Sequence, residues 1–181
     1  MAVTAETVRA TFDELRQALK HVIDPLLAQD DGGHYTVALL VAIGSEALSR
    51  LQGRTEDHIF VALMTKRGLT AEMARDVFKA LRHGIAHTYD TKFIQAGRLK
   101  VELIVSWRLK THLSVRREPP GLFLNVRTMW EDLRDVIEAL KASLPPGGTL
   151  PDRWVKESIH QGHPHAVEGW RQWITTHESG D

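Results

Sequence analysis

Residues 70–90, TAEMARDVFKALRHGIAHTYD, predict one amphipathic helix that ends on a cluster of ionisable side chains. Apolar residues recur in it every four positions, with two more beside them, which makes a single stripe. The members of the stripe are Met73, Val77, Leu81 and Ile85, flanked by Ala74 and Phe78. Thr70 is the expected N-cap, and Glu72 and Asp76 lie toward the positive end of the helix dipole. The stripe implies that this helix packs against a hydrophobic core.

The C-terminal end of the same stretch carries the candidate chemistry. Arg82, His83 and His87 bring a guanidinium and two imidazoles together, followed by Tyr89 and Asp90. No other part of the sequence puts a strong cation and two titratable imidazoles so close together. We therefore look for a chemical site here first.

Composition limits the function classes. The chain has 181 residues, enough for one domain with a sizeable core. Its 23 basic and 23 acidic residues give no net charge, so any polyanion has to be bound by a local patch. The chain has no cysteine, which excludes disulfides, thiolate catalysis and cysteine-based zinc sites.

Hydropathy indicates a soluble chain. The N-terminus has no basic start followed by a long apolar run, so no signal peptide is expected. The longest apolar stretch, residues 37–43, is too short to span a bilayer. We expect a cytoplasmic protein without membrane contact.

Three further helices are expected before residue 70, at 4–29, at 35–51 and from Thr55 to Gly68. Pro25 is expected to kink the first helix or to end it near Asp24. The second helix is apolar on most sides, which is typical of a central, buried helix. Glu46 interrupts it, and a carboxylate on such a helix needs a partner or a cleft.

The pattern changes after Asp90 to short segments of alternating polarity, at 92–96, 99–107, 109–116 and 122–127. They predict a small antiparallel meander or a pair of hairpins with one face packed on the helices. A last bundle helix is expected at 129–144, with Thr128 as N-cap and Glu131 at its third position.

The run at 144–148, LPPGG, is the strongest break in the chain. Two short helices are expected beyond it, at 151–161 and 164–177, and their tryptophans (Trp154, Trp170 and Trp173) are expected to dock on the domain or on a partner chain. The fold class is therefore α+β, mostly α. Residues 1–144 form a helical domain that carries the sheet at about 92–127, and residues 145–181 form a Pro/Gly linker and a Trp-rich helical tail.

The segment RHGIAH, residues 82–87, has an arginine, four intervening residues and a histidine. It resembles the R-x4-6-H motif of the HEPN superfamily of small helical proteins, and ALRHGIAHTY is close to the RNxxxH form that ends in AHxY. His83 stands where asparagine is more usual. ALLVAIGSEALSRL in the second helix resembles the apolar, acid-containing helix that often precedes the motif. The resemblance covers roughly residues 5–90 and implies a HEPN-like helical bundle, with the small antiparallel meander and the helical tail outside it.

The resemblance implies a metal-independent endoribonuclease that uses no cofactor. His87 would be the general base or acid, since an imidazole pKa near ~6.5 suits that work at neutral pH. Arg82 would bind the scissile phosphate and stabilise the transition state. His83 would be a second donor, and Glu46 would orient an imidazole.

The resemblance also implies partners. The ligand would be RNA or a nucleotide, and two sites would face each other across a homodimer. An antitoxin or a nucleotidyltransferase-type protein would be the physiological partner. Two other interpretations stay open: a non-catalytic HEPN-like module that binds nucleotide, RNA or protein as a dimer, and a structural domain whose arginine and histidines complement the helix dipole.

Helix geometry separates the two motif residues. On a regular α-helix, residues five apart point about 140° away from each other. Arg82 and His87 would then not share a face, whereas His83 and His87, four apart, would. Arg82 and His87 can converge only if the helix departs from regular geometry at 84–87, where Gly84 favours fraying.

Two other groups of residues were weighed. The basic, aromatic segment 107–117 offers Arg108, Lys110 and Arg116 as phosphate contacts, with Tyr89 as a further binding residue, although a solvated sheet face is the favoured interpretation. The histidines (His83, His87, His160, His163 and His165) have no HExxH pattern, so no metal site is expected. Phosphate-loop and GxSxG signatures are absent from the sequence.

Overall fold

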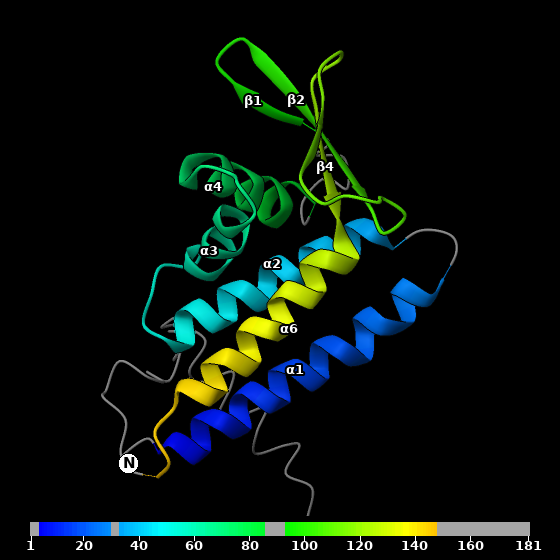
Figure 1. Ribbon diagram of the computed structural model, residues 1–181. Helices are drawn as coiled ribbons and strands as arrows, with labels where there is room; N and C mark the ends of the chain where they lie inside the picture. The colour runs from blue at the N-terminus through cyan, green and yellow to red at the C-terminus, as the bar shows by residue number, and fades with distance from the viewer. Residues whose placement is uncertain (1–3, 30–32, 86–92, 148–181) are drawn as a thin grey trace, which may run out of the picture.

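The computed structural model describes residues 4–29, 33–85 and 93–147 (Figure 1). Within them the expectation of an α+β, mostly helical protein is confirmed. The elements, in chain order, are α1 (Ala5–Ala28), α2 (His34–Leu51), α3 (His58–Lys66), α4 (Ala71–Lys79), the π-helical η1 (Ala80–Ile85), β1 (Phe93–Ala96), β2 (Leu99–Ser106), β3 (Ser114–Arg116), β4 (Gly121–Asn125) and α6 (Val126–Ser143). No helix of these described ranges is long and apolar enough to cross a membrane.

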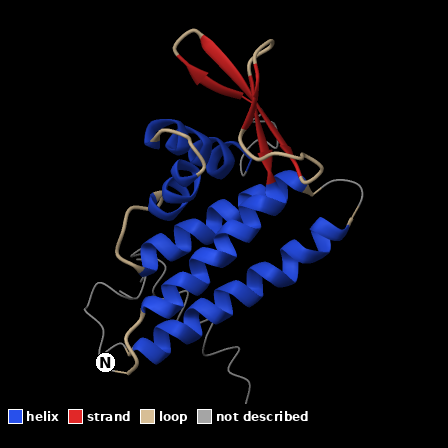
Figure 2. Cartoon of the chain, viewed as in Figure 1, coloured by secondary structure: helices blue, strands red, loops and turns tan. Residues whose placement is uncertain are grey.

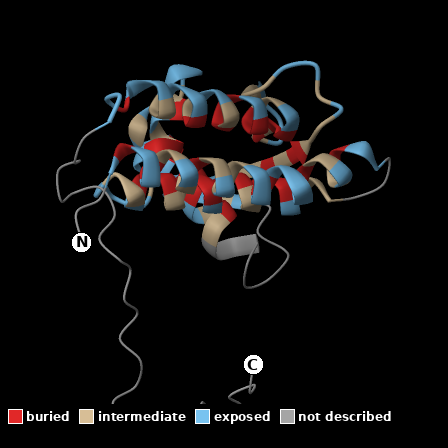
Figure 3. Ribbon diagram, turned by 90° about the horizontal axis from the view of Figure 1, so that it is seen from below, coloured by how far each residue is buried: buried red, intermediate tan, exposed pale blue. Residues whose placement is uncertain are grey.

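Helix α2 is the centre of the fold, as its all-round apolar character predicts. It contacts α1, α6, α3, η1 and β2. The three long helices α1, α2 and α6 lie side by side (Figure 2), and buried residues gather on their facing sides (Figure 3). Gly44 permits this close approach, because a Cβ there would lie 2.6 Å from Cδ1 of Leu19 on α1 and 3.1 Å from Cδ2 of Leu133 on α6.

Helix α1 runs from Ala5 through Pro25 to Ala28, close to the expected 4–29, so of the two effects expected of the proline an end near Asp24 is wrong. A proline costs a helix one hydrogen bond and a steric clash, about 3 kcal/mol in the interior. Tertiary contacts oppose that cost, since Ile23 and Leu27 are buried on either side of the proline. The indole Nε1 of Trp130 on α6 also donates to Oδ1 of Asp24 at 3.1 Å. Packing against α6 therefore holds the last turn in place.

The stretch 70–90 begins as expected and then changes its winding. Thr70 is the N-cap of α4, where its hydroxyl accepts from the backbone N–H of Met73 at 3.2 Å. Val77 and Leu81 of the predicted stripe are buried, whereas Met73 is 49% exposed. The α-helix ends at Lys79, and the π-helix η1 continues the chain to Ile85. The rest of the predicted helix lies outside the described residues.

The four strands form one mixed sheet in the order β1-β2-β4-β3. Strands β1 and β2 make an antiparallel hairpin, whose turn contains Gly97 at a φ of 60° that favours glycine. Strands β3 and β4 are also antiparallel, but β2 and β4 are parallel. Of the two expected arrangements, the antiparallel meander is therefore wrong, whereas a pair of hairpins is present as β1–β2 and β3–β4.

The loop 107–113 explains that pairing. A strand was expected over 109–116, but only Ser114–Arg116 is extended and paired. Asn125 at the end of β4 holds the preceding loop, since its Nδ2 donates to the carbonyl of Leu109 at 2.6 Å and its backbone N–H donates to Nδ1 of His112 at 3.1 Å. After β2 the chain therefore crosses over as a loop before it forms β3. As a result β4, not β3, pairs with β2.

Asn125 is also the N-cap of α6, in place of the expected Thr128. Its Oδ1 accepts from the backbone N–H groups of Arg127 at 2.9 Å and Thr128 at 3.1 Å, so the helix begins at Val126. Strand β4 therefore passes directly into α6, and the sheet sits at the N-terminal end of that helix (Figure 1). The expected tail helices at 151–161 and 164–177 lie outside the described residues.

Candidate functional site

Glu46 and Arg82 form an ion pair between the middle of α2 and the first turn of η1. Nε of Arg82 lies 2.7 Å from Oε2 of Glu46, and the side chains are 33% and 15% exposed. One turn further along α2, Nε of Arg50 lies 2.9 Å from Oε1 of the same carboxylate. Arg50 also reaches Glu56, with Nη2 3.1 Å from Oε2. Two guanidiniums thus share one half-enclosed carboxylate.

The charge state of Glu46 follows from this arrangement. Burial alone raises its pKa, but the hydrogen bonds and charges of Arg82 and Arg50 outweigh burial and lower the pKa below its ordinary value. Glu46 is therefore ionised at neutral pH. Arg82 and Arg50 are thus the partners that a partly buried carboxylate on an apolar helix requires.

The structure brings together only part of the predicted catalytic group. Arg82 and Glu46 are in contact, but Glu46 binds two guanidiniums rather than an imidazole within the described residues. The backbone of His83 lies in η1, and its side chain is outside the described part. His87 and Tyr89 lie wholly outside the described residues. The roles of the two histidines and of Tyr89 stay predictions from sequence.

The π-helical winding bears on the geometry of the motif. A π-helix is hydrogen-bonded from residue i to residue i+5, whereas an α-helix is bonded over four. Arg82 lies inside the π-helical segment Ala80–Ile85. The divergence of about 140° between residues five apart belongs to regular α-helical winding. It therefore does not hold for the segment in which Arg82 lies, and single π-helical turns are frequent at functional sites.

The predicted phosphate-binding residues after β2 do not form one strand face. Arg108 and Lys110 lie in the loop 107–113, where the Arg108 guanidinium lies 4.7 Å from the ring centroid of Trp107. Arg116 lies on β3, where it pairs with Glu102 and its Nε donates to the carbonyl of Pro119 at 2.8 Å. These three residues therefore do not lie along a single strand, as a strand over 109–116 would have placed Lys110 and Arg116.

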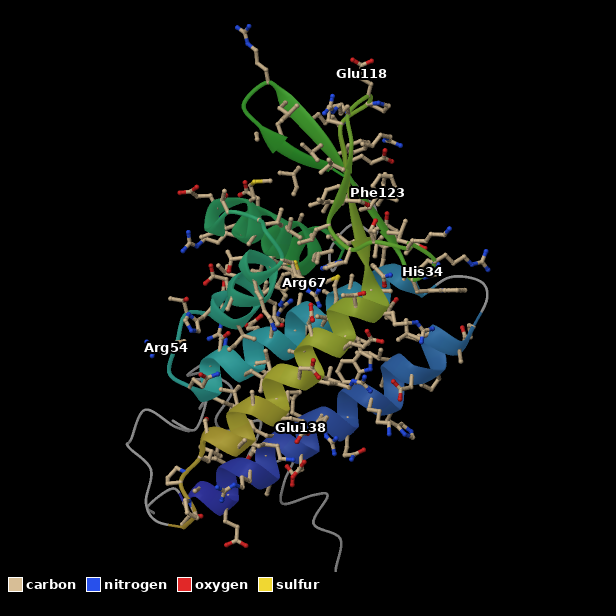
Figure 4. All side chains as sticks on the ribbon, viewed as in Figure 1. His34, Arg54, Arg67, Glu118, Phe123 and Glu138 are labelled. Carbon is tan, nitrogen blue, oxygen red and sulfur yellow. The ribbon has the colours of Figure 1, made fainter. Side chains whose placement is uncertain are left out.

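A second polar cluster, around Asp132, was not foreseen from sequence. Arg67, which follows α3 and is labelled in Figure 4, binds this buried carboxylate of α6 at both oxygens, with Nη2 2.6 Å from Oδ1 and Nε 3.0 Å from Oδ2. The two residues are 65 positions apart, so no local sequence pattern predicts that they pair. The only hint in the sequence is a carboxylate directly before Leu133 on the apolar side of a helix.

His112 completes this cluster from the loop before β3. Burial, with a smaller contribution from Arg67, lowers the pKa of His112 to about 4 despite the opposing charge of Asp132. Its Nδ1 accepts from the backbone of Asn125, so the neutral ring carries its proton on Nε2. That Nε2 is buried and makes no hydrogen bond with the described residues.

Known proteins add no assignment to either cluster. No family model, no curated protein and no solved structure matches this chain. In the described ranges, no group of three or more histidine or carboxylate side chains is placed to hold a metal ion. The histidines at 83, 87, 160, 163 and 165, which were weighed as metal ligands, have side chains outside those ranges. The function therefore has to be argued from the arrangement of Arg82 and Glu46.

Proposed function

We propose that this protein is a HEPN-like, metal-independent endoribonuclease in which Arg82 binds the scissile phosphate and His87 transfers protons. The observation that supports it most is the ion pair between Arg82 and Glu46. It anchors the motif arginine to the central helix of the fold at 2.7 Å. It does so inside the π-helical segment Ala80–Ile85, which includes Arg82.

Arg82 is suited to phosphate binding because only part of its guanidinium is occupied. The group has five N–H donors in a fixed fork. Within the described residues, Glu46 accepts a hydrogen bond from one of these donors, the N–H at Nε. The side chain remains 33% exposed, so its outer edge can meet a phosphate. An arginine already held by a second side chain loses little freedom on binding, which favours stabilisation of the transition state.

Arg50 shares the negative charge of Glu46 with Arg82. It binds the second oxygen of the same carboxylate, and its Nη2 also lies 3.1 Å from Oε2 of Glu56. The four side chains are therefore balanced in charge. The positive group that a phosphate would meet is the exposed part of the Arg82 guanidinium itself.

The role of His87 is inferred from the sequence, where it is the imidazole five positions after Arg82. In the proposed reaction a base removes the proton of the ribose 2′-hydroxyl, and the 2′-oxygen attacks phosphorus. The 5′-oxygen of the next nucleotide leaves and takes up a proton. The products are a 2′,3′-cyclic phosphate and a 5′-hydroxyl. His87 is the base or the acid, and His83 is a second donor.

The test is cleavage of mixed RNA by the purified protein in EDTA. We expect products that end in 2′,3′-cyclic phosphate, and loss of cleavage in His87→Ala at unchanged helicity. His21→Ala is the matched control, since His21 is exposed on α1 away from η1. Cleavage that survives His87→Ala, or its absence from the wild-type protein on diverse RNAs, would overturn the proposal.

A second candidate is a non-catalytic HEPN-like module that binds RNA, nucleotide or a protein partner as a dimer. The observation that favours it is that Arg82 already pairs with Glu46 inside the monomer. It predicts RNA affinity that falls steeply with salt, without cleavage. Both candidates include a homodimer, with an antitoxin or a nucleotidyltransferase-type protein as partner, and sedimentation of the purified chain tests the dimer. For a purely structural domain, Arg82→Ala would change only stability.

A further inference from the structure

An apolar groove of about 330 Å³ lies between α4 and the outer half of the sheet. Met73, Asp76 and Val77 form its helical wall, and all four strands contribute to the opposite wall. The apolar sheet residues that matter here are Ile94, Leu99, Val101, Val115 and Leu122. No residue of α3 lines the groove, and neither does Arg82 or Glu46.

The groove continues the face of the sheet that packs on the helices. At the inner end of that face Leu103 and Leu122 are 1% and 5% exposed. At the outer end Leu99 is 51% exposed and Val115 is 72% exposed, while Met73 opposite them is 49% exposed. Contiguous exposed apolar side chains of this kind mark a surface that binds another segment. The hydrophobic core therefore continues into an exposed apolar surface, which no other described residue covers.

We propose that the C-terminal tail of the same chain, residues 164–177, docks in this groove. The tail sequence places Val167, Trp170 and Ile174 at the i, i+3, i+7 spacing of one helical face, with Trp173 beside them. An amphipathic helix that lays such a face into an apolar groove is a recurrent recognition mode. Large aromatic side chains are mostly buried in folded proteins, so these tryptophans need a surface to cover them.

The charged residues of the two segments permit this docking. The groove lining holds one acidic and one basic side chain, Asp76 and Arg116. Residues 164–177 also hold one of each, Glu168 and Arg171. Neither segment carries a net charge that would repel the other, so apolar contact is what favours the groove.

The tail is long enough to reach. Helix α6 starts at the sheet and leads away from it over 18 residues, a length of about 27 Å at 1.5 Å per residue. Figure 1 shows its C-terminal end at the opposite end of the bundle from the sheet. The chain between Gly147 and Val167 can span roughly 65 Å when extended. The same chain can therefore return along the bundle and place Trp170 in the groove.

Cysteine cross-linking tests this directly, because the chain has no cysteine of its own. The full-length double variant Val115→Cys/Gln172→Cys is treated with a short bis-maleimide. We expect a cross-link within one chain, seen as a shifted monomer band. The matched control is Val22→Cys/Gln172→Cys, since Val22 is 46% exposed on α1 and does not line the groove. Equal cross-linking of both pairs, or cross-linked dimers alone, would contradict docking of the chain on itself; dimers would indicate a second copy instead.

A charge placed in the groove gives an independent readout. Val115→Asp changes a largely exposed side chain, so the fold is retained, but it puts a carboxylate where the tail lies. We expect trypsin to cleave after Arg171 at least several-fold faster in this variant than in the wild-type chain. Val22→Asp should cleave at the wild-type rate. If Val115→Asp leaves the rate at Arg171 unchanged, the tail does not occupy the groove, whatever the outcome of the RNA assays.

Discussion

Nε of Arg82 lies 2.7 Å from Oε2 of Glu46, a residue 36 positions earlier in the chain. This contact ties the π-helical end of α4 to the middle of α2, and it joins the two parts of the sequence that carry the resemblance. The same carboxylate holds Arg50. Glu46 is therefore the residue on which the placement of Arg82 depends.

The first prediction is that Glu46→Gln destabilises the protein by about 1–2 kcal/mol, because a neutral amide replaces a carboxylate that accepts two charge-assisted hydrogen bonds. Urea unfolding measures the loss. Glu56→Gln is the control: among the residues that the structure describes, Glu56 pairs with Arg50, and both side chains are about half exposed. Its effect should stay below about 0.5 kcal/mol. A loss as large in Glu56→Gln would show that the Arg82 contact contributes nothing specific.

The second prediction concerns the pH dependence of that contribution. The folded pKa of Glu46 is lowered, so the unfolded state binds more protons in acid. The stability that Glu46 contributes is then fully present above its unfolded pKa, near ~4.3, and is lost as pH falls through the folded pKa. The difference in unfolding free energy between wild type and Glu46→Gln should shrink over that range. A difference that stays constant from pH 7 to pH 3 would contradict the ion pair.

His112 gives a third prediction in a different pH range. Burial lowers its folded pKa to about 4, from an ordinary value of 6.5. Between these values the unfolded state binds a proton that the folded state does not, so stability falls as pH drops from 6.5 to 4. The loss is on the order of 2–3 kcal/mol. Urea unfolding at a series of pH values from 7 to 4 measures it.

His112→Asn is the variant that isolates this effect. The asparagine Oδ1 can still accept from the backbone N–H of Asn125, but nothing at position 112 titrates. The variant should lose most of the slope between pH 6.5 and 4. His58→Asn, at an exposed position on α3, should keep the wild-type slope. If both variants keep the slope, another group causes it.

Local patterns predicted the helices of the described residues and the cap at Thr70, because capping and amphipathic spacing are properties of neighbouring residues. Thr70 accepts a hydrogen bond at the helix start where the sequence places it, and Thr4 does the same for α1. Thr128 failed as a cap although Thr128 and Glu131 match the capping pattern. Asn125 lies three residues earlier and accepts from two backbone N–H groups instead. Two competing caps on one helix cannot be ranked from the sequence alone.

The features that sequence did not predict depend on contacts between distant residues. The parallel pairing of β2 with β4 follows from a loop held by Asn125, and Arg67 finds Asp132 across 65 positions. At the candidate site, the sequence indicated that Glu46 needed a partner but not that Arg82 and Arg50 supply it. Nothing in ALRHGI distinguishes π-helical from α-helical winding.

The fourth prediction concerns Gly44, where α2 packs closely against both α1 and α6. An alanine Cβ would lie 2.6 Å from Leu19 Cδ1 and 3.1 Å from Leu133 Cδ2. Replacing a helical glycine gains about 1 kcal/mol of helix propensity, but overpacking of this kind costs about 1–3 kcal/mol. We expect Gly44→Ala to lower the unfolding free energy by about 1 kcal/mol.

A double-mutant cycle separates the clash from other effects at Gly44. Leu19→Ala removes the nearest atom, and alone it should cost about 2–3 kcal/mol. In the Gly44→Ala background the same change should cost less, because it also relieves the overlap. Additive losses in the cycle would mean that Leu19 moves aside without cost.

The last prediction is that Arg67→Lys destabilises the protein by about 1–2 kcal/mol although the charge is kept. Arg67 binds both oxygens of Asp132 through Nε and Nη2, and a lysine ammonium cannot reproduce that fork. The Asp132 carboxylate is buried, so a lost hydrogen bond there is not replaced by water. Arg75→Lys is the matched control, since Arg75 makes one hydrogen bond to Asp57 at 3.1 Å from a side chain that is 50% exposed. The control should change stability by less than about 0.5 kcal/mol. Equal losses in the two variants would show that the two-point geometry at Asp132 adds nothing to a simple ion pair.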